Sequence, residues 1–370
     1  MKYRRMLIEV ESPEEMGYGT IRNNLSESSI FDRNVAEFDV DLSGLTLLYG
    51  AHRGDVALRE QVARQAESET ITPDHVLMTT GAAGALFVIA TTLLDRDSHL
   101  VVVRPNYATN LETPRAIGCA MSCVDLSFDD AFRLDIDAVE RAVTPATRLI
   151  SVTTPHNPTG TMLLWNDLNR LDAIAEKHRC HLLVDETYRD LTHGAPSPSA
   201  ASISERVIAV SSLSKAFGTP GLRTGWLISR DAALFETLLA AKEQIGICGS
   251  SIDERLATTV LEGRERWLAK SRPRNLAHLG IVRDWIAAES RMEWVEPAGG
   301  VVCFPRMIPD STFDVDHFYK SLLDDHGTYV GAGHWFEMPK HYMRIGFAWP
   351  NESELRNGLS GISAALREQD

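Results

Sequence analysis

Short apolar runs alternate with longer amphipathic stretches along the chain up to about residue 228. Apolar runs bounded by turn-forming residues predict buried strands, and the amphipathic stretches between them predict helices. A regular alternation of this kind is typical of an α/β fold, in which a mainly parallel sheet is covered by helices on both faces. The predicted strands are residues 76–78, 100–103, 149–152, 182–184, 207–210 and 226–228.

The pattern changes beyond about residue 265. A helical pattern covers residues 276–286, and strand-like segments follow at 300–304 and 343–347. In the last predicted helix, apolar residues recur at helical spacing and form one stripe that should pack on a small sheet. These residues are Leu355, Leu359, Ile362 and Leu366. We therefore expect a large domain over residues 45–265 and a small α+β domain that includes residues 266–370.

The composition indicates a globular protein with an acidic surface. The 370 residues are 44% hydrophobic and 24% charged, with a formal net charge of −14 and a pI near 5.3. A nucleic-acid or anionic-membrane surface needs clustered lysine and arginine, so this charge opposes both. No apolar run is long enough to span a bilayer, and the N-terminal segment becomes acidic too early for a signal peptide. We expect a cytoplasmic protein that binds neither nucleic acid nor membranes.

The cysteines and histidines predict neither disulfides nor a metal site. The five cysteines form no Cys-x-x-Cys pair, and an odd number suits neither a disulfide framework nor a zinc site. The twelve histidines show no His-Glu-x-x-His spacing or comparable ligand pattern. We expect reduced thiols and no bound metal.

The segment 211–226 holds the most informative group of polar residues. Lys215 follows the predicted strand 207–210, and in an open α/β sheet ligands bind beyond the carboxyl ends of the strands. Ser212 precedes Lys215 by three residues and Arg223 follows it by eight, so a hydroxyl, an ammonium and a guanidinium could converge on one phosphate-bearing ligand. The glycines at 218, 221 and 225 permit close backbone approach. A lone lysine in a serine-rich turn would otherwise be a solvated surface charge.

The spacing in this segment resembles that of a known enzyme superfamily. Ser212, Ser214, Lys215, Gly221, Arg223 and Gly225 occur in the order found around the lysine of the class I/II aminotransferases, which are fold-type I pyridoxal-phosphate enzymes. Further segments match in the same order from about residue 45 to residue 348.

The resemblance implies a seven-stranded, mainly parallel sheet between helices, and it assigns residues 1–44 to the small domain. It also implies pyridoxal 5'-phosphate as the cofactor. Lys215 would form a Schiff base with the cofactor aldehyde, exchange it for the amine of an amino-acid substrate, and then move the α-proton. Burial near cationic groups such as Arg223 would lower the pKa of the lysine amine for this task.

Two predicted strand ends supply further candidates for cofactor binding. Gly81, Ala82 and Ala83 follow a strand and begin an apolar helical run, so their free amides and the helix dipole can bind a phosphate. On these residues alone a plain turn is the simpler interpretation, and the resemblance gives the phosphate role to the amides of Ala82 and Ala83. Tyr107 follows strand 100–103, and the resemblance implies that its ring stacks on the cofactor ring, although packing is the commoner role of such a tyrosine.

Two more strand ends carry polar residues. Asn157 lies in a turn fixed by two prolines and a glycine, and it matches the family asparagine that donates to the phenolic oxygen of the cofactor. Asp185 ends an apolar strand, where a carboxylate is costly unless it has a partner. The resemblance implies that Asp185 pairs with the protonated pyridine nitrogen and that Tyr188 lies near the phenolic oxygen. The alternatives are a structural turn at Asn157 and a helix N-cap at Asp185.

Two other matches concern the substrate and the assembly. Arg344 lies in a segment, 342–348, that resembles the family strand whose arginine binds the α-carboxylate of the substrate. Tyr49 lies in a segment that resembles the one whose tyrosine reaches the cofactor phosphate of a neighbouring subunit. If Tyr49 does the same, the active unit is a homodimer with shared sites. An exposed arginine and a core tyrosine are the alternatives.

One segment departs from the common family pattern. Where many aminotransferases carry a glycine-containing entry segment, residues 23–29 here read Asn-Asn-Leu-Ser-Glu-Ser-Ser. Glu27 and the three serines would make a polar, acidic pocket that suits a cationic or hydroxylated substrate side chain, whereas a solvated loop is the alternative. We also expect residues 18–30, 245–251 and 331–338 to shape the pocket.

The segments 213–223, 299–306 and 343–347 also resemble the capreomycidine-synthase-like branch, which cyclises its substrate. The resemblance therefore leaves the reaction class open. Aminotransfer is the first hypothesis, and elimination, replacement or cyclisation by the same cofactor is the second. A non-catalytic ligand-sensing relative is the third, and the joint presence of Lys215, Asp185, Tyr188 and Arg223 opposes it.

Overall fold

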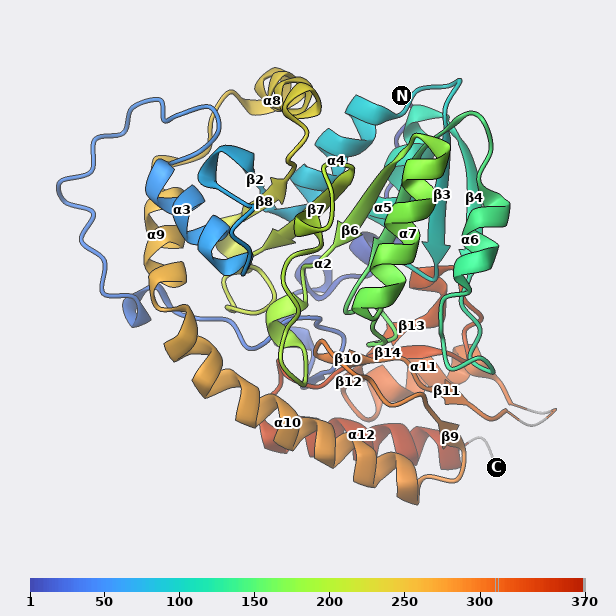
Figure 1. Cartoon of the computed structure of the whole chain (residues 1–370). Helices are drawn as coiled ribbons and strands as arrows, with labels where there is room; N and C mark the ends of the chain where they lie inside the picture. Colours follow the sequence, from blue (N-terminus) through green and yellow to red (C-terminus); the bar gives the residue numbers. More distant parts are fainter. Residues whose placement is uncertain (310, 312, 369–370) are drawn as a thin grey trace.

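The computed structural model describes residues 1–309, 311 and 313–368. Its centre is a seven-stranded sheet in which only β8 runs antiparallel to its neighbours β2 and β7. The sheet lies between two layers of helices (Figure 1). In spatial order its strands are β2 (Val76–Thr80), β8 (Thr224–Ile228), β7 (Val207–Ser212), β6 (His181–Asp185), β5 (Thr147–Thr153), β3 (His99–Arg104) and β4 (Ala120–Asp125). The predicted α/β fold with a mainly parallel sheet is confirmed.

Alternate residues of each strand pack on opposite faces of this sheet, as strand geometry requires. In β2, Leu77 packs with α4, α5 and α8, while Val76 and Met78 face the opposite core. Both faces are buried, and this explains why the strands read as continuous apolar runs. The helices of this part of the chain are α3 (Val56–Gln65), α4 (Gly81–Leu93), α5 (Thr109–Ile117), α6 (Ile136–Ala142), α7 (Trp165–His178), α8 (Ala232–Gly246) and α9 (Ser251–Glu262).

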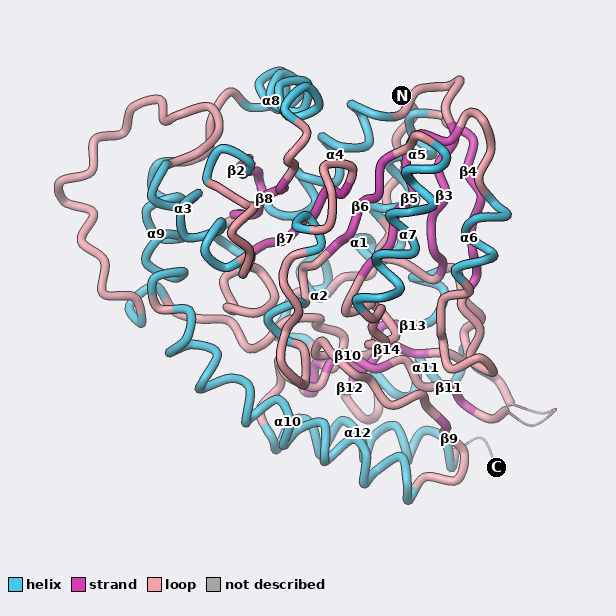
Figure 2. The backbone as a smooth tube through the Cα atoms, in the orientation of Figure 1, coloured by secondary structure: helices cyan, strands magenta, loops and turns pink. Residues whose placement is uncertain are grey.

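A second group of elements lies below the large sheet in the view of Figure 1, and Figure 2 shows its short strands apart from those of the sheet. The apolar stripe predicted for the last helix is buried on α12, which packs against α10 and α11. The elements are α10 (Arg264–Ala288), β9 (Met292–Glu293), β10 (Val302–Cys303), β11 (Arg306–Met307), α11 (Val315–Asp324), β12 (Thr328–Tyr329), β13 (Gly331–Ala332), β14 (Met343–Gly346) and α12 (Glu352–Arg367).

The N-terminal segment reaches both parts of the molecule. Its elements are α1 (Leu7–Val10), α2 (Pro13–Met16) and β1 (Asn23–Asn24). β1 pairs in parallel with β12, far along the chain, and the amide of Lys2 donates to the carbonyl of Ala116 at the end of α5. The domain boundaries near residues 44 and 265 stay a prediction.

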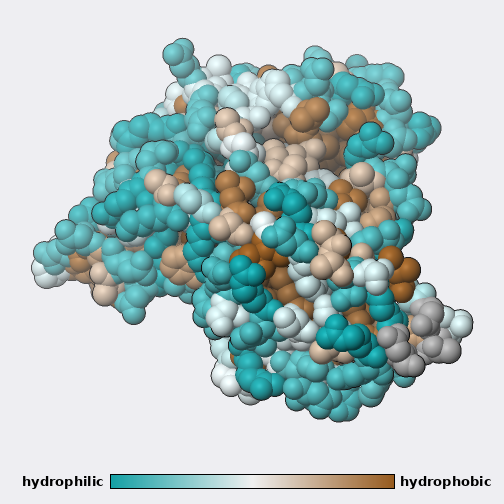
Figure 3. Space-filling model, turned by 90° about the horizontal axis from the view of Figure 1, so that it is seen from below, coloured by the Kyte–Doolittle hydropathy of each residue, from teal (hydrophilic) through white to brown (hydrophobic). Residues whose placement is uncertain are grey.

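The surface is mainly hydrophilic on the face seen in Figure 3, with hydrophobic residues gathered near its middle. Within the described residues, no helix combines the length and apolar character that crossing a bilayer requires. The same residues contain no group of three or more His, Cys, Asp or Glu side chains placed to hold a metal ion. All five cysteines are free.

Candidate active site

A cavity of about 350 Å³ lies where the carboxyl ends of β5, β6 and β7 meet the N-terminus of α4 and the N-terminal segment. All of the predicted site residues except Gly81 and Tyr49 line it. Those that do are Glu27, Ala82, Ala83, Tyr107, Asn157, Asp185, Tyr188, Ser212, Ser214, Lys215, Arg223 and Arg344. The fold therefore brings together residues that lie more than three hundred positions apart in the chain.

Lys215 enters this cavity from the turn after β7. Its Nζ donates to Ser28 Oγ at 3.0 Å. Removal from bulk water lowers the pKa of Lys215, the nearby Glu27 carboxylate raises it, and the guanidinium of Arg344 lowers it again. The net direction is downward, which increases the share of the neutral, nucleophilic amine.

The turn that opens α4 forms a narrow cradle beside Arg223. Gly81 has a φ of +68°, and a Cβ at this position would lie 2.8 Å from Nη2 of Arg223. A Cβ on Gly225 would lie 2.3 Å from the carbonyl carbon of Gly81, so Gly225 is needed for β8 to approach the start of α4, whereas Gly81 leaves room for the Arg223 side chain. The free amides of Ala82 and Ala83, together with Arg223, can bind a phosphate here.

The prediction for Gly221 was wrong. A Cβ at Gly221 would have no atom within 4 Å, so this glycine allows no close approach. Gly218 does: its φ is +63°, and a Cβ there would lie 2.2 Å from the carbonyl oxygen of Phe31. Gly218 thus places the lysine turn against the N-terminal segment.

Asp185 ends β6 as a buried carboxylate that borders the cavity. Its Oδ1 accepts hydrogen bonds from the amide of Thr187 at 3.0 Å and from Thr187 Oγ1 at 2.6 Å. Burial raises the pKa of Asp185, whereas the Thr187 hydrogen bonds and the charge of Lys215 lower it. Among the residues that the structure describes, these hydrogen bonds involve only Oδ1, so Oδ2 remains for a protonated partner in the cavity.

Arg344 lies on β14 and is only 4% exposed. Its Nη1 donates to Asn157 Oδ1 at 3.2 Å, and its Nη2 donates to the carbonyl of Ser26 at 2.6 Å. Nε is buried and has no hydrogen-bond partner within the described residues. A buried donor without a partner is costly, so this arginine is suited to binding an anionic ligand.

Tyr188 and Tyr107 lie on the same cavity. The Tyr188 hydroxyl donates to the carbonyl of Ser28 at 2.7 Å, and burial raises the pKa of Tyr188 to about 12. Tyr107 is half-buried, and burial raises its pKa too. Both phenols therefore remain protonated donors at neutral pH.

The segment 23–29 is mostly buried, so the alternative of a solvated loop was wrong. Ser26, Glu27 and Ser28 line the cavity. Of the other segments expected to shape the pocket, 331–338 contributes Trp335, whereas 245–251 contributes no lining residue in this chain. Instead, Ser250 caps α9 by accepting from the amide of Asp253 at 3.3 Å.

Five lining residues come from α1, α2 and the turn between them, which the sequence reasoning missed: Ile8, Glu9, Ser12, Pro13 and Glu14. Glu11 holds this turn in place, because its Oε2 accepts from Trp335 Nε1 at 2.6 Å and contacts His334 Nε2 at 2.8 Å. Ser12-Pro13-Glu14 is a helix-start signal that could have located α2. No local signal shows that α2 borders the site.

Tyr49 lies outside this cavity and is 80% exposed. It belongs to a long loop that extends from the body of the molecule beside α3 and α9 (Figure 1). Leu47 and Leu48 on the same loop are also exposed.

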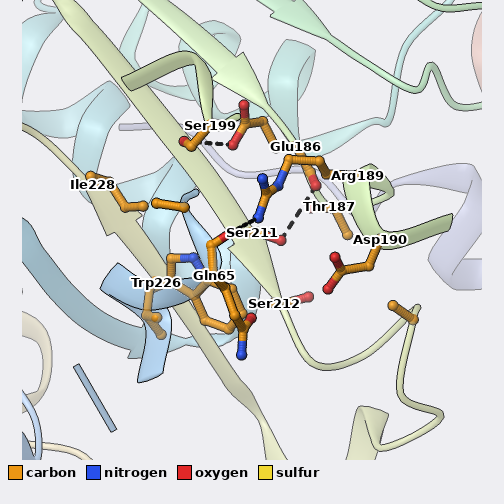
Figure 4. A pocket seen from close by; sticks show the side chains of 13 residues that line it. Gln65, Glu186, Thr187, Arg189, Asp190, Ser199, Ser211, Ser212, Trp226 and Ile228 are labelled. Carbon is orange, nitrogen blue, oxygen red and sulfur yellow. Dashed lines mark hydrogen bonds between the residues drawn. The ribbon is translucent and has the colours of Figure 1, made fainter. Parts of the chain in front are cut away.

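A second cavity of about 20 Å³ shares Thr187 and Ser212 with the first (Figure 4). Glu186 is buried beside it and accepts from Ser199 Oγ at 2.8 Å and from the amide of Ala200 at 2.6 Å. Burial raises the pKa of this carboxyl. The volume admits about one water molecule, so these residues fix the chain after Asp185 and leave no room for a substrate.

One cavity is thus bordered by four features. They are a lysine with a lowered pKa, a buried aspartate, a glycine cradle with an arginine, and a second arginine with a free donor. This set fits pyridoxal phosphate, because the cradle suits its phosphate, Asp185 suits its ring nitrogen and Lys215 suits its aldehyde. The fold and site define a pyridoxal-phosphate-dependent enzyme.

Comparisons with known proteins agree with this conclusion about the class of enzyme. Residues 27–362 match the model of the family described as aminotransferase class I and II. The chain is similar to capreomycidine synthase of Streptomyces vinaceus, with 31% identity over 329 residues that cover 88% of this chain and 82% of the relative. It is also similar to arginine–pyruvate transaminase AruH of Pseudomonas aeruginosa, with 28% identity over 81% of this chain and 77% of the relative.

A solved structure of a PLP-dependent aminotransferase from Streptococcus suis superposes with a TM-score of 0.91 at 25% identity, covering 100% of this chain and 99% of that one. The chain belongs to the aminotransferase class I and II family. It is a pyridoxal-phosphate-dependent transferase, as the resemblance of its motifs implied.

Proposed function

We propose that this enzyme transfers the amino group of an amino acid and that Lys215 is the residue to which the cofactor is attached. The observation that carries the proposal is the convergence of Lys215, Asp185 and Arg344 on one cavity. The cofactor, when bound, supplies an electron sink for the bond that breaks at the α-carbon.

Each of these side chains has a distinct task. Arg344 binds and orients the α-carboxylate through its free donor, which holds the α-carbon near Lys215. Lys215, as a neutral amine, would take the proton from the α-carbon of the substrate and, in aminotransfer, deliver it to the carbon that carried the aldehyde of the cofactor. Asp185 would hold a proton on the ring nitrogen of the cofactor, and Tyr107 would pack on the ring. Asn157 would donate to the phenolic oxygen, and Tyr188, whose hydroxyl donates to the Ser28 carbonyl, would lie near that oxygen.

The phosphate would be held by other residues that line the same cavity. Ala82, Ala83, Ser212, Ser214 and Arg223 supply amides, hydroxyls and a guanidinium for it. Gly81 contributes by leaving room for Arg223.

A second candidate reaction uses the same site for elimination, replacement or cyclisation. The 31% identity to a protein named capreomycidine synthase favours it. The early steps at Lys215 are common to both reactions, so the geometry of the cofactor residues supports each equally.

The experiment is to incubate the cofactor-loaded protein with a panel of amino acids in the absence of any keto acid, followed by mass spectrometry of cofactor and products. Conversion of the cofactor to its amine form, with release of a keto acid, would establish aminotransfer. Retention of the aldehyde form, with loss of a leaving group or ring closure in the amino acid, would establish the second reaction. Lys215→Ala should take up no covalently bound cofactor in either case.

We also propose a homodimer in which Tyr49 reaches the cofactor phosphate of the other subunit. The exposure of Leu47, Leu48 and Tyr49 supports it, since a second copy would cover these side chains. Mixing Tyr49→Ala with Lys215→Ala tests it, because a mixed dimer combines one intact Lys215 with one intact Tyr49. Random exchange should restore about a quarter of the wild-type activity, and no restoration would oppose the shared site.

The proposed location is the cytoplasm, where five free cysteines remain reduced.

A further inference from the structure

Besides Asp185, three carboxylates line the cavity together with Lys215: Glu9 from α1, Glu14 from α2, and Glu27 from the segment after β1. Glu27 has a defined position, because the Tyr18 hydroxyl donates to its Oε1 at 3.1 Å and the Tyr18 ring stacks on Trp349. The cavity thus holds three acidic side chains in addition to Asp185.

The cations that line the cavity in the described part of the chain are Lys215, Arg223 and Arg344. Under the proposed function, Arg223 is neutralised by the cofactor phosphate, Arg344 by the α-carboxylate, and Lys215 is a neutral amine while the substrate is bound. No cation of the protein then remains in the cavity to balance Glu9, Glu14 and Glu27.

Two other glutamates of the N-terminal segment have partners on the protein, unlike Glu9 and Glu14. Glu11 contacts His334, and Glu15 pairs with Arg5 at 3.1 Å. Glu9 and Glu14, which line the cavity, form no ion pair with any residue that the structure describes. Both carboxylates are therefore available to a ligand.

An independent feature points to a ligand of defined charge. Arg344 borders the cavity with a buried Nε that has no partner among the described residues, and this donor suits an anion such as an α-carboxylate. With its carboxylate held there, an amino acid extends its side chain past carboxylates and past the apolar surface of Ile8, Pro13, Leu86 and Trp335.

We propose that the substrate is an amino acid whose long side chain ends in a cation, an ammonium or a guanidinium, and that Glu27, Glu14 and Glu9 bind that cation. This inference rests on the proposed function. The apolar lining accommodates the methylene stem of such a side chain. An acidic side chain would be repelled by the three carboxylates, and a neutral one would leave them unbalanced.

The test measures equilibrium binding to the cofactor-loaded protein by calorimetry, with pairs of amino acids that differ in charge but little in shape. Arginine is compared with citrulline, and lysine with norleucine. We expect at least one cationic member to bind about ten-fold or more tightly than its neutral partner, and added salt to reduce the difference.

The variants Glu9→Gln, Glu14→Gln and Glu27→Gln should each reduce this preference. Glu15→Gln is the control, because Glu15 lies next to Glu14 on α2 but outside the cavity, and it should leave the preference unchanged. Glu14→Lys, at an exposed position of α2, should shift the preference toward glutamate. Equal affinity within both pairs, or a preference unchanged in all three Gln variants, would overturn the inference.

Its failure can be told apart from failure of the proposed function. If the protein takes up the cofactor and binds amino acids without regard to charge, only the inference is wrong. If Lys215 takes up no pyridoxal phosphate, the proposed function itself is wrong and the substrate inference falls with it.

Discussion

The Lys215 ammonium donates to Ser28 Oγ at 3.0 Å although 187 residues separate the two positions. The carbonyl of the same serine accepts from the Tyr188 hydroxyl at 2.7 Å. One residue of the N-terminal segment thus contacts two side chains from the ends of neighbouring strands. The contact to Lys215 favours the charged form of the amine and opposes the effect of burial.

Ser28→Ala should therefore lower the pKa of Lys215 further. The neutral amine then predominates at lower pH, and only the neutral amine attacks an aldehyde. The rate at which cofactor-free protein captures pyridoxal phosphate should therefore rise at a lower pH than in the wild type. Ser29→Ala, at a buried neighbour that does not line the cavity, serves as the control. A shift to higher pH would contradict the proposed effect.

Gly225→Ala should disrupt the cradle at the start of α4. The added Cβ would lie 2.3 Å from the Gly81 carbonyl carbon, and backbone atoms cannot move aside as a flexible side chain can. We expect a loss of about 3 kcal/mol in the free energy of unfolding and weaker binding of pyridoxal phosphate. Gly221→Ala is the matched control, because nothing lies within 4 Å of its added Cβ. Urea unfolding of the cofactor-free proteins and cofactor titrations measure the two effects.

Arg344→Gln should weaken the binding of amino acids about 10- to 100-fold, because a charge-assisted contact to the carboxylate is lost. The amine made by decarboxylating the same amino acid lacks this contact and should bind equally well to variant and wild type. Arg306→Gln is the control, because Arg306 lies on β11, which pairs with β9, and binds Glu293 outside the cavity, so this change should alter neither affinity. If both ligands weaken alike, Arg344 supports the structure of the site and does not select the carboxylate.

The sequence predicted the strands whose two faces are both buried, because such strands read as unbroken apolar runs. It missed β4, one of the two edge strands, where Ala120 and Asp125 are exposed and the residues between them include a serine and a cysteine. The antiparallel direction of β8 also had no local signal, since direction follows from the path of the connection.

Some residues of the site could likewise be predicted from the sequence, and others could not. Residues at the ends of successive strands, such as Asn157, Asp185 and Lys215, could be predicted because parallel strands bring their carboxyl ends together. The residues of α1 and α2 could not, because two four-residue helices carry almost no periodicity and are placed by distant contacts such as that from Tyr329 to the Glu11 carbonyl. Their position depends on tertiary packing that local patterns do not encode.

His156 should make the stability of the protein depend on pH. It is 4% exposed, its Nδ1 lies 2.8 Å from Thr159 Oγ1, and burial lowers its pKa to about 4. An unfolded histidine has a pKa of about 6.5, so between about pH 6.5 and 4 the unfolded chain binds a proton at this site that the folded chain does not. The contribution of His156 to the free energy of unfolding is therefore fully present above about pH 6.5. It falls by up to about 3 kcal/mol as the pH decreases toward 4.

His156→Gln removes the titrating group from the same position and should flatten this dependence. The free energy of unfolding by urea, measured from pH 7 to pH 4.5, should differ most between wild type and variant at pH 7, and the difference should shrink as the pH falls. His317→Gln, at an exposed position on α11, controls for the loss of one histidine and should leave the wild-type slope in place. A slope in His156→Gln as steep as that of the wild type would assign the pH dependence to other groups, because the buried imidazole would then contribute nothing to it.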